Sequence, residues 1–333
     1  MNRKLFERAM LGDLELKNRL IRSATWEGLA ERDGHMPEGL YRIYEGLAKG
    51  GVGAIITGFT SVSDHDHYFE GMARLSNDFL IPEHRHLIGI CHRYGCTVIT
   101  QLALGEYACG VEPDDMSEAD ILRVISMFAD AAVRAEKSGY DGVQIHAAHG
   151  FFLSRFISPV YNHRTDGYGG SPENRGRIIT DIIEEIRKKT LKLHISMKIN
   201  CSDYIRGGLT HQDSSRICRL CAAAGIDSIE VSGNGTSVPG IKAGVNEAYF
   251  SEFALMVAEK VDIPIILVGG HRSIDNMERV LNHGKVEFLS VSRPLICEPD
   301  LPDRWFHGDR IPSKCISCNM CYRTKGHRCC LNR

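Results

Sequence analysis

Short apolar segments alternate with longer helical patterns along this chain, and the alternation repeats eight times. Strands that are each followed by a helix form either a closed barrel or an open doubly wound sheet. Eight such units over about 290 residues favour a (β/α)8 TIM barrel, because this fold uses ~250 residues plus insertions. No Gly-x-Gly-x-x-Gly follows the first strand, which disfavours the open dinucleotide-binding sheet. The expected strands are Arg19–Ser23, Gly53–Gly58, Thr97–Leu102, Gly142–Ala147, His194–Asn200, Asp227–Ser232, Pro264–Gly269 and Glu287–Ser292.

Capping residues mark several of the helices between these strands. Ser117 opens a capping pattern ahead of an apolar helical face, and Gly139 stands where a C-terminal glycine belongs. Ser171 can cap a second helix with Pro172 in its first turn, and Gly225 closes a third. The extra residues are expected in the loops after the third, fourth and sixth strands.

Charge and hydropathy exclude some partners. The formal net charge of -2 arises from 40 Lys plus Arg against 42 Asp plus Glu, which leaves no basic face for nucleic acid or anionic lipid. The longest apolar runs, such as residues 263–268, are far shorter than the roughly 20 residues that cross a bilayer. The N-terminus lacks the apolar core of a secretory signal. We therefore expect a cytoplasmic protein with neither nucleic-acid nor membrane partners.

The cysteines fall into two groups. Of the 12 Cys, five lie within the last 19 residues and seven are scattered. The scattered ones are expected to be reduced core thiols. Since no linker divides the chain, we expect a barrel over residues 1–310 and a cysteine-rich, metal-binding tail over residues 311–333.

The tail has a spacing that suits metal. Cys315, Cys318 and Cys321 follow the three-ligand spacing of ferredoxin-type clusters, and Cys329 or Cys330 can supply the fourth thiolate. We take Cys329 as the fourth. Zinc on four thiolates, with His327 as a further ligand, and an unligated or disulfide-forming tail are the alternatives.

Chemistry in a TIM barrel lies at the carboxyl ends of the strands. Loops after the seventh and eighth strands commonly bind phosphate, and here they carry Gly269, Gly270 and Arg293. A tight turn with a surface arginine is the alternative. The other strand ends carry Ser23, Ala24, Thr25, Gly58, Gln101, His146 with His149, Lys198 with Asn200, Ser232 to Asn234, and Ser292.

Two of these strand ends allow several interpretations. His146 and His149 can be metal ligands, core histidines or donors to a substrate oxygen. A catalytic zinc would need a third ligand, for which Asp203 and His271 are available. Lys198 can form a Schiff base, face an anionic cofactor, or extend toward solvent from the strand end.

Several motifs resemble the Old Yellow Enzyme family of FMN-dependent oxidoreductases, in particular the N-terminal barrel of bacterial 2,4-dienoyl-CoA reductase-like proteins. The resemblance covers essentially the whole chain and implies a (β/α)8 barrel with FMN at its mouth. The motifs are Leu16–Thr25, Gly50–Gly53, Ile55–Gly58, Gln101–Ala103, Ile145–Gly150, Ser158–Pro159, Asn162–Asp166 and Tyr168–Arg175.

The resemblance also implies roles for the strand-end residues. His146 and His149 would donate to a carbonyl oxygen, so that a conjugated C=C bond accepts hydride from reduced FMN. Lys198 would face the flavin at a position where the family generally has Arg. The expected flavin-binding residues are Ser23, Ala24, Thr25, Gly58, Gln101 and Lys198, with Gly269, Gly270, Ser292 and Arg293 around the phosphate.

The tail and the partners are also implied by the family. The dienoyl-CoA reductase-like relatives carry a [4Fe-4S] cluster on a similar run of cysteines, usually with wider spacing. A cluster here would pass electrons to FMN from a separate donor protein, whereas without one NADH or NADPH would reduce FMN directly. We also expect an enone or enoyl substrate and a homo-oligomer.

Two departures from the family pattern bear on mechanism. Phe151 stands where the family usually has the Tyr that protonates the substrate, and a phenyl ring cannot donate a proton. Tyr107, Tyr168 and water are the substitutes considered. Leu104 stands where His is common. The leading hypothesis is an FMN-dependent ene-reductase. The alternatives are a Schiff-base lyase or aldolase using Lys198, an FMN protein with another flavin reaction fed by a separate donor, and a scaffold with a metal-held docking tail.

Overall fold

The computed structural model describes residues 4–108 and 110–332, and its centre is a closed barrel of eight parallel strands. Pairing of β3 with β4 closes the ring, because Ile21 registers with Ala54 and Arg22 with Ile55. The TIM-barrel prediction is confirmed. The barrel strands are β3 (Leu20–Arg22), β4 (Ala54–Ser61), β6 (Thr97–Ala103), β7 (Gly142–Ala147), β8 (His194–Asn200), β9 (Ser228–Ser232), β10 (Ile265–Val268) and β11 (Phe288–Val291), and the two-residue strand β5 (Ala73–Arg74) pairs with the end of β4.

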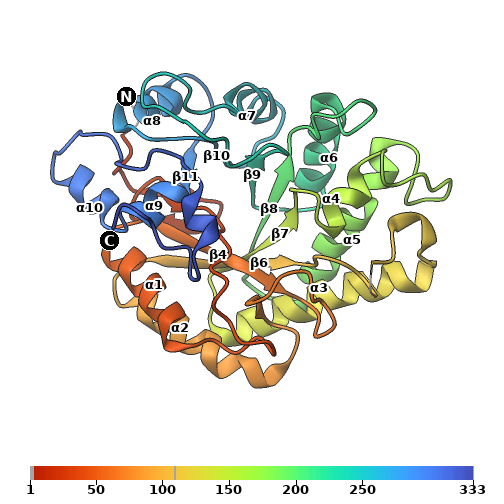
Figure 1. Cartoon of the computed structure of the whole chain (residues 1–333). Helices are drawn as coiled ribbons and strands as arrows, with labels where there is room; N and C mark the ends of the chain where they lie inside the picture. Colours follow the sequence, from red (N-terminus) through yellow and green to blue (C-terminus); the bar gives the residue numbers. More distant parts are fainter. Residues whose placement is uncertain (1–3, 109, 333) are drawn as a thin grey trace.

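Helices surround the barrel, as Figure 1 shows, and their ends follow the capping residues. Ser117 accepts from the amide of Asp120 in a complete capping box, and Gly139 ends that helix in the left-handed region at φ 93°. The helices are α1 (Glu38–Lys49), α2 (Ile81–His92), α3 (Glu118–Ser138), α4 (Phe152–Ile157), α5 (Pro172–Lys189), α6 (His211–Ala223), α7 (Ser251–Ala258), α8 (Ile274–Asn282), α9 (Arg293–Cys297) and α10 (Leu301–Phe306), with short 3-10 turns η1 (Asp78–Leu80), η2 (Pro113–Asp115) and η3 (Met320–Arg323).

A hairpin that the sequence analysis did not predict closes the floor of the barrel. Strands β1 (Ala9–Leu11) and β2 (Leu14–Leu16) pair antiparallel. Leu11 and Leu16 are fully buried in a cluster of apolar residues from β3, β4, β6, β10 and β11. At the turn, a Cβ on Gly12 would lie 3.2 Å from the Cβ of Asp227, next to the start of β9. The hairpin therefore packs against the amino ends of the barrel strands.

The opposite end of the barrel is covered by long loops and by the cysteine-rich tail. The loops after β6 (104–117), β7 (148–171, which includes α4) and β9 (233–250) are long, as expected, but the segments after β3 (23–37) and β4 (62–80), which were not singled out, are each longer than the loop after β6. The tail turns back across the mouth, where the Asn319 amide donates to the carbonyl oxygen of Ser237 in the loop after β9 (2.9 Å). In Figure 1 the tail lies beside α9. Residues 311–333 are thus in contact with the barrel as far as they are described.

The sequence predictions about membrane spans and about the scattered cysteines can be compared with this fold. No helix within residues 4–108 and 110–332 is both long and apolar enough to cross a membrane. Six of the seven scattered cysteines are buried free thiols, as predicted, and the seventh, Cys109, lies outside the described residues.

Candidate active site

A cavity at the mouth of the barrel brings together most of the predicted site residues. Gly58 and Gly269 do not line it. The Gly58 amide instead donates to the Tyr44 hydroxyl (2.8 Å) in a small neighbouring cavity that Glu27 also lines. The predicted residues that line the main cavity are Ser23, Ala24, Thr25, Gln101, His146, His149, Lys198, Gly270, Ser292 and Arg293.

A buried polar network joins four strands at the base of the cavity. Lys198 Nζ on β8 lies 3.1 Å from a carboxylate oxygen of Glu230 on β9, and it donates to Ser23 Oγ at 2.8 Å. Gln101 donates to Gln144, which in turn donates to Glu230. The side chains of Lys198 and Glu230 are only 3% and 0% exposed. The network thus fixes a cation at the cavity floor, with its counter-charge on the adjacent strand.

The electrostatics of the pair follow from burial and contacts. Burial alone would raise the pKa of Glu230, but Lys198 and the hydroxyls of Ser290 and Ser23 lower it below its ordinary value. Ser23 and Ser290 donate to Glu230 at 2.7 Å and 2.6 Å. An ammonium held by a buried carboxylate is not the free amine that Schiff-base chemistry requires. The contacts of Lys198 therefore favour a fixed charge over a nucleophile.

The two histidines at the end of β7 are held as neutral rings. Burial is the main cause that lowers the pKa of His146 well below its usual range, and burial with the Lys198 charge lowers that of His149 to about 3. His149 Nε2 shares a hydrogen bond with Ser232 Oγ (2.7 Å), whereas His146 Nδ1 is buried without a partner among the described residues. Neutral imidazoles donate hydrogen bonds without carrying charge. The pair therefore suits a carbonyl oxygen in the cavity.

The candidate proton donors from the sequence lie outside the cavity. The Tyr107 hydroxyl bonds Asp120 (2.9 Å), and the Tyr168 hydroxyl donates to Asp181 (2.8 Å). Neither lines the cavity, whereas Phe151 does, with its ring centre 4.9 Å from that of His146. Residue 151 therefore lines the cavity beside His146 and offers it only an apolar ring.

The predicted phosphate end of the cavity shows a glycine turn and two buried arginines. Gly269 and Gly270 adopt φ of 131° and 80°, and a Cβ on Gly270 would lie 2.8 Å from the Tyr249 ring. Arg293 donates to the backbone of Val238 and to Asn319. Arg272 also lines this end, which sequence reasoning missed because it lies two residues beyond the glycines. Because a side chain at residue 270 would clash with Tyr249, glycine is required at this turn, and its backbone can approach a bound group closely.

Aromatic rings that the sequence analysis missed form the wall above the histidines. Trp26 stacks on Phe69 with ring centres 4.8 Å apart, and Phe59 contacts Phe151 at 5.2 Å. Phe69 lies in the loop after β4, well beyond the strand end. Sequence reasoning considered only the residues at the strand ends, so it did not place Phe69 at the cavity. Tyr322 and His327 of the tail also line this cavity. The wall is aromatic, and its stacked Trp26–Phe69 pair offers a planar ligand a parallel surface, while Phe59 and Phe151 meet the wall edge-on.

Comparison with known proteins identifies the family of this barrel. The model of the NADH:flavin oxidoreductase / NADH oxidase family matches residues 4–115 and 108–310. The chain belongs to this family. The resemblance to Old Yellow Enzyme proteins is therefore confirmed.

Individual relatives differ in how much of their length this chain spans. NADPH dehydrogenase of Geobacillus thermodenitrificans is 31% identical over 91% of this chain and 93% of its own. A metal reductase of Desulforamulus reducens is 29% identical over 98% of this chain but only 53% of its own length, so the chain spans about half of that relative. The old yellow enzyme homologue of Zymomonas mobilis shares the fold, with a TM-score of 0.80 at 22% identity, covering 93% of this chain and 94% of its own.

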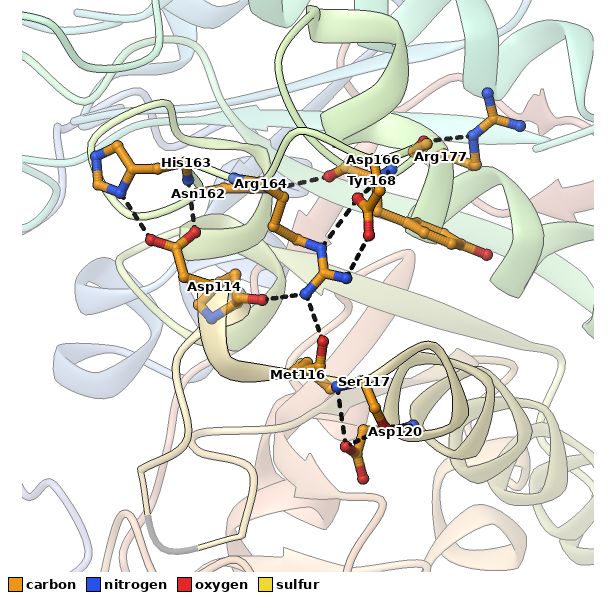
Figure 2. A network of polar contacts seen from close by, with 12 residues as sticks. Asp114, Met116, Ser117, Asp120, Asn162, His163, Arg164, Asp166, Tyr168 and Arg177 are labelled. Atoms are coloured by element: carbon orange, nitrogen blue, oxygen red, sulfur yellow. Dashed lines mark hydrogen bonds and ion pairs between the residues drawn. The ribbon is translucent and has the colours of Figure 1, made fainter.

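The motif Asn162–Asp166, one of those on which the family resemblance rests, has a structural task. Arg164, within Asn162–Asp166, pairs with Asp166 and donates to the carbonyl oxygens of Pro113 (2.7 Å) and Met116 (2.6 Å). Figure 2 shows this guanidinium between the loop after β7 and the segment that leads into α3. The motif thus ties two loops of the mouth together, outside the cavity.

The tail cysteines gather around one small pocket. Cys318 and Cys330 bring their sulfurs within 3.9 Å, and buried Cys297 at the end of α9 contacts Cys329. Within residues 4–108 and 110–332, however, no three His, Cys, Asp or Glu side chains are close enough together to hold a metal ion. The predicted ligand set therefore stays a prediction. The thiols that line the pocket are Cys315, Cys318, Cys321, Cys329 and Cys330.

Proposed function

We propose that this protein is an FMN-dependent oxidoreductase that reduces an activated C=C bond, with NADH or NADPH as electron donor. The observation that carries the proposal is the pair of neutral imidazoles, His146 and His149, facing the same cavity as the buried Lys198 cation. One end of the cavity can polarise a carbonyl, and its base can stabilise negative charge on a cofactor.

The residues present fit a bound flavin. FMN would supply the hydride chemistry, which no side chain of this barrel can supply. The hydroxyls of Ser23 and Thr25, the Gln101 amide and Lys198 would hold its polar ring system, since all four line the cavity. The side-chain-free turn at Gly270, with Arg293 and Arg272 beside it, would hold the phosphate.

The chain's own residues would orient and polarise the substrate. His146 and His149 would donate to its carbonyl oxygen, and the ring of Phe151 would exclude water from one side. Because both imidazoles are neutral over the physiological pH range, they would act as hydrogen-bond donors without giving up a proton.

The test is anaerobic reduction of 2-cyclohexenone by NADH or NADPH with the purified protein. We expect a yellow protein, and we expect His146→Ala and His149→Ala each to lower kcat/KM by about 10²-fold, the usual effect of losing one donor to a developing oxyanion. His65→Ala, at an exposed histidine, is the matched control and should behave as wild type. A colourless protein, or His variants with unchanged kcat/KM, would contradict the proposal.

We also propose that protonation of the alkene does not come from residue 151. Tyr107 and Tyr168 are engaged elsewhere, so solvent or another group at the cavity would supply the proton. Phe151→Tyr should then raise turnover of the enone by about tenfold or more, because a positioned acid typically contributes 10²–10⁴-fold. No gain in the variant would mean that the missing phenol does not limit this reaction.

We propose further that the tail binds a [4Fe-4S] cluster through Cys315, Cys318, Cys321 and Cys329, which would give FMN a second electron source, a separate donor protein, beside NADH or NADPH. Five thiols around one pocket support it. Because these thiols do not form a ligand set in the described residues, no step of the reaction above depends on the cluster. Iron, sulfide and zinc analysis of protein purified without oxygen tests it: about four irons per chain are expected, and zinc or no metal would refute it.

A further inference from the structure

The cavity contains a histidine that the proposed reaction does not use. His327, in the cysteine-rich tail, is 6% exposed and lines the cavity together with His146 and His149. Its Nδ1 is buried without a hydrogen-bond partner among the described residues. A buried polar atom that lacks a partner is unfavourable unless a ligand or water satisfies it. His327 is therefore a polar side chain of the cavity wall whose Nδ1 none of the described residues satisfies.

A tight turn of the tail places this histidine. Gly326 and His327 both lie in the left-handed region, at φ 73° and 46°. A Cβ on Gly326 would lie 3.2 Å from Leu29, so the turn packs directly on the loop after β3. The His327 amide donates to Thr324 O (3.1 Å), which closes the turn. Non-glycine residues adopt this conformation rarely, and mostly where the surroundings hold them in it.

Aromatic contacts fix the orientation of the imidazole. The Trp26 ring is perpendicular to it at 5.3 Å, and the Tyr322 ring is nearly so at 5.0 Å. The Tyr322 hydroxyl in turn shares a hydrogen bond with Ser237 Oγ (2.7 Å) in the loop after β9. Two edge contacts hold the ring in place without engaging Nδ1.

His327 and the His146–His149 pair approach the cavity from well-separated parts of the barrel. His327 packs on Trp26, which lies in the loop after β3, whereas His146 is the next-to-last residue of β7. In the closed ring, β3 and β7 are separated by β4 and β6 on one side and by four strands on the other. A ligand held by the pair at one end therefore extends its far end toward His327, across the aromatic wall of Trp26 and Phe69.

We propose that His327 is a substrate-binding residue that hydrogen-bonds a second polar group, at the end of a compact planar substrate away from the carbonyl that His146 and His149 bind. This inference rests on the proposed function, because it names the substrate class of the same cavity. It assigns the substrate two hydrogen-bonding groups and one flat ring or conjugated system between them. It also gives the cysteine-rich tail a role in selecting the substrate.

The experiment compares a ligand that has two polar groups with one that has a single polar group. The full-length, flavin-loaded, oxidised protein is titrated with p-hydroxybenzaldehyde or with benzaldehyde, and the change in flavin absorbance gives the dissociation constant. His327→Phe keeps a ring against Trp26 and Tyr322 but removes both nitrogens. We expect the Kd of p-hydroxybenzaldehyde to rise about tenfold in this variant, the size of one lost hydrogen bond, and that of benzaldehyde to change less than about twofold.

Two controls separate binding from structure. His307→Phe alters a histidine whose side chain is 68% exposed, and it should leave both Kd values unchanged. His327→Asn keeps a hydrogen-bonding group, and it should restore part of the preference for p-hydroxybenzaldehyde. Equal weakening of both ligands in His327→Phe, no weakening of either, or loss of flavin from either His327 variant would overturn the proposal. A wild-type protein without flavin would instead refute the proposed function itself.

Discussion

The two ends of this barrel are closed by the two ends of the chain, and they are closed by different chemistry. The N-terminal hairpin seals the floor with Leu11 and Leu16, which are fully buried against barrel residues such as Phe288. The C-terminal tail crosses the mouth with polar and aromatic groups, among them Tyr322 and His327. Apolar side chains that close a barrel end need only to fill the space without voids. Polar side chains in the same place also need a hydrogen-bond partner for each buried polar atom.

The difference shows in what each end leaves unsatisfied. Three imidazoles that line the mouth cavity, those of His146, His271 and His327, have a buried Nδ1 without a partner among the described residues. The floor cluster is made of Leu, Ile, Ala and Phe side chains, which carry no polar atoms. The floor is not free of such atoms, because His194 Nδ1 beside the hairpin is also buried without a hydrogen bond among the described residues, but at the mouth three of them line one cavity.

The largest expected effect concerns the ion pair at the base of the mouth. Glu230→Ala would leave the buried Lys198 ammonium without its counter-charge, and such a change typically lowers the free energy of unfolding by about 3–5 kcal/mol. Glu230→Gln separates charge from volume, because it also removes the counter-charge but keeps the side-chain volume and can still accept from Ser290. A loss in Glu230→Gln close to that in Glu230→Ala would assign the effect to the charge. Urea unfolding followed by circular dichroism measures both. A loss below about 1 kcal/mol in Glu230→Ala would mean that water or relaxation replaces the carboxylate.

A cavity made in the floor of the barrel should lower the stability of the protein and leave its activity unchanged. Leu16→Ala removes a fully buried side chain and should lower the free energy of unfolding by about 3 kcal/mol, within the usual range for such cavities. Because Leu16 lies at the far end of the barrel, KM for the enone should stay at its wild-type value. Met10→Ala, on the same hairpin but 52% exposed, should change stability by less than about 0.5 kcal/mol. A raised KM in Leu16→Ala would show that the two ends are coupled.

The smallest expected effect, per pH unit, is the acid sensitivity that one buried imidazole contributes at each end of the barrel. Burial lowers the pKa of His194 near the floor to about 4 and that of His271 at the mouth to about 4. Between pH 6.5 and 4 the unfolded chain binds protons that these folded imidazoles do not, so the free energy of unfolding falls as the pH falls. Each contributes up to about 1.4 kcal/mol per pH unit in that window.

Single variants measure these contributions. His194→Gln can keep the bond to Ser228 and should flatten the acid slope of the free energy of unfolding by up to that amount. Glu27 acts in the opposite direction: burial raises its pKa to about 7, so its contribution is lost as the pH rises from 4.5 through 7. A slope that His194→Gln leaves unchanged would mean that this imidazole is protonated in the folded protein.

Much of the architecture could be predicted because its signals are local. Each apolar run marks one strand and each capping serine one helix start, so the eight-stranded barrel follows from short stretches read one by one. Strand ends of a parallel barrel converge on one face. Residues as distant in sequence as Ser23, Lys198 and Arg293 could therefore be assigned to one cavity before any coordinates.

The remaining features depend on contacts that no local pattern encodes. The hairpin of the floor, Phe69 in the wall and His327 in the tail reach their places through long-range packing, and the pairing of Lys198 with Glu230 depends on the register of β8 against β9. The sequence by itself determined the barrel, its mouth and the paired histidines, because periodicity and capping act over a few residues. Only the tertiary structure decided what closes each end and which buried groups stay unpaired, because burial and hydrogen-bond satisfaction are properties of the folded chain as a whole.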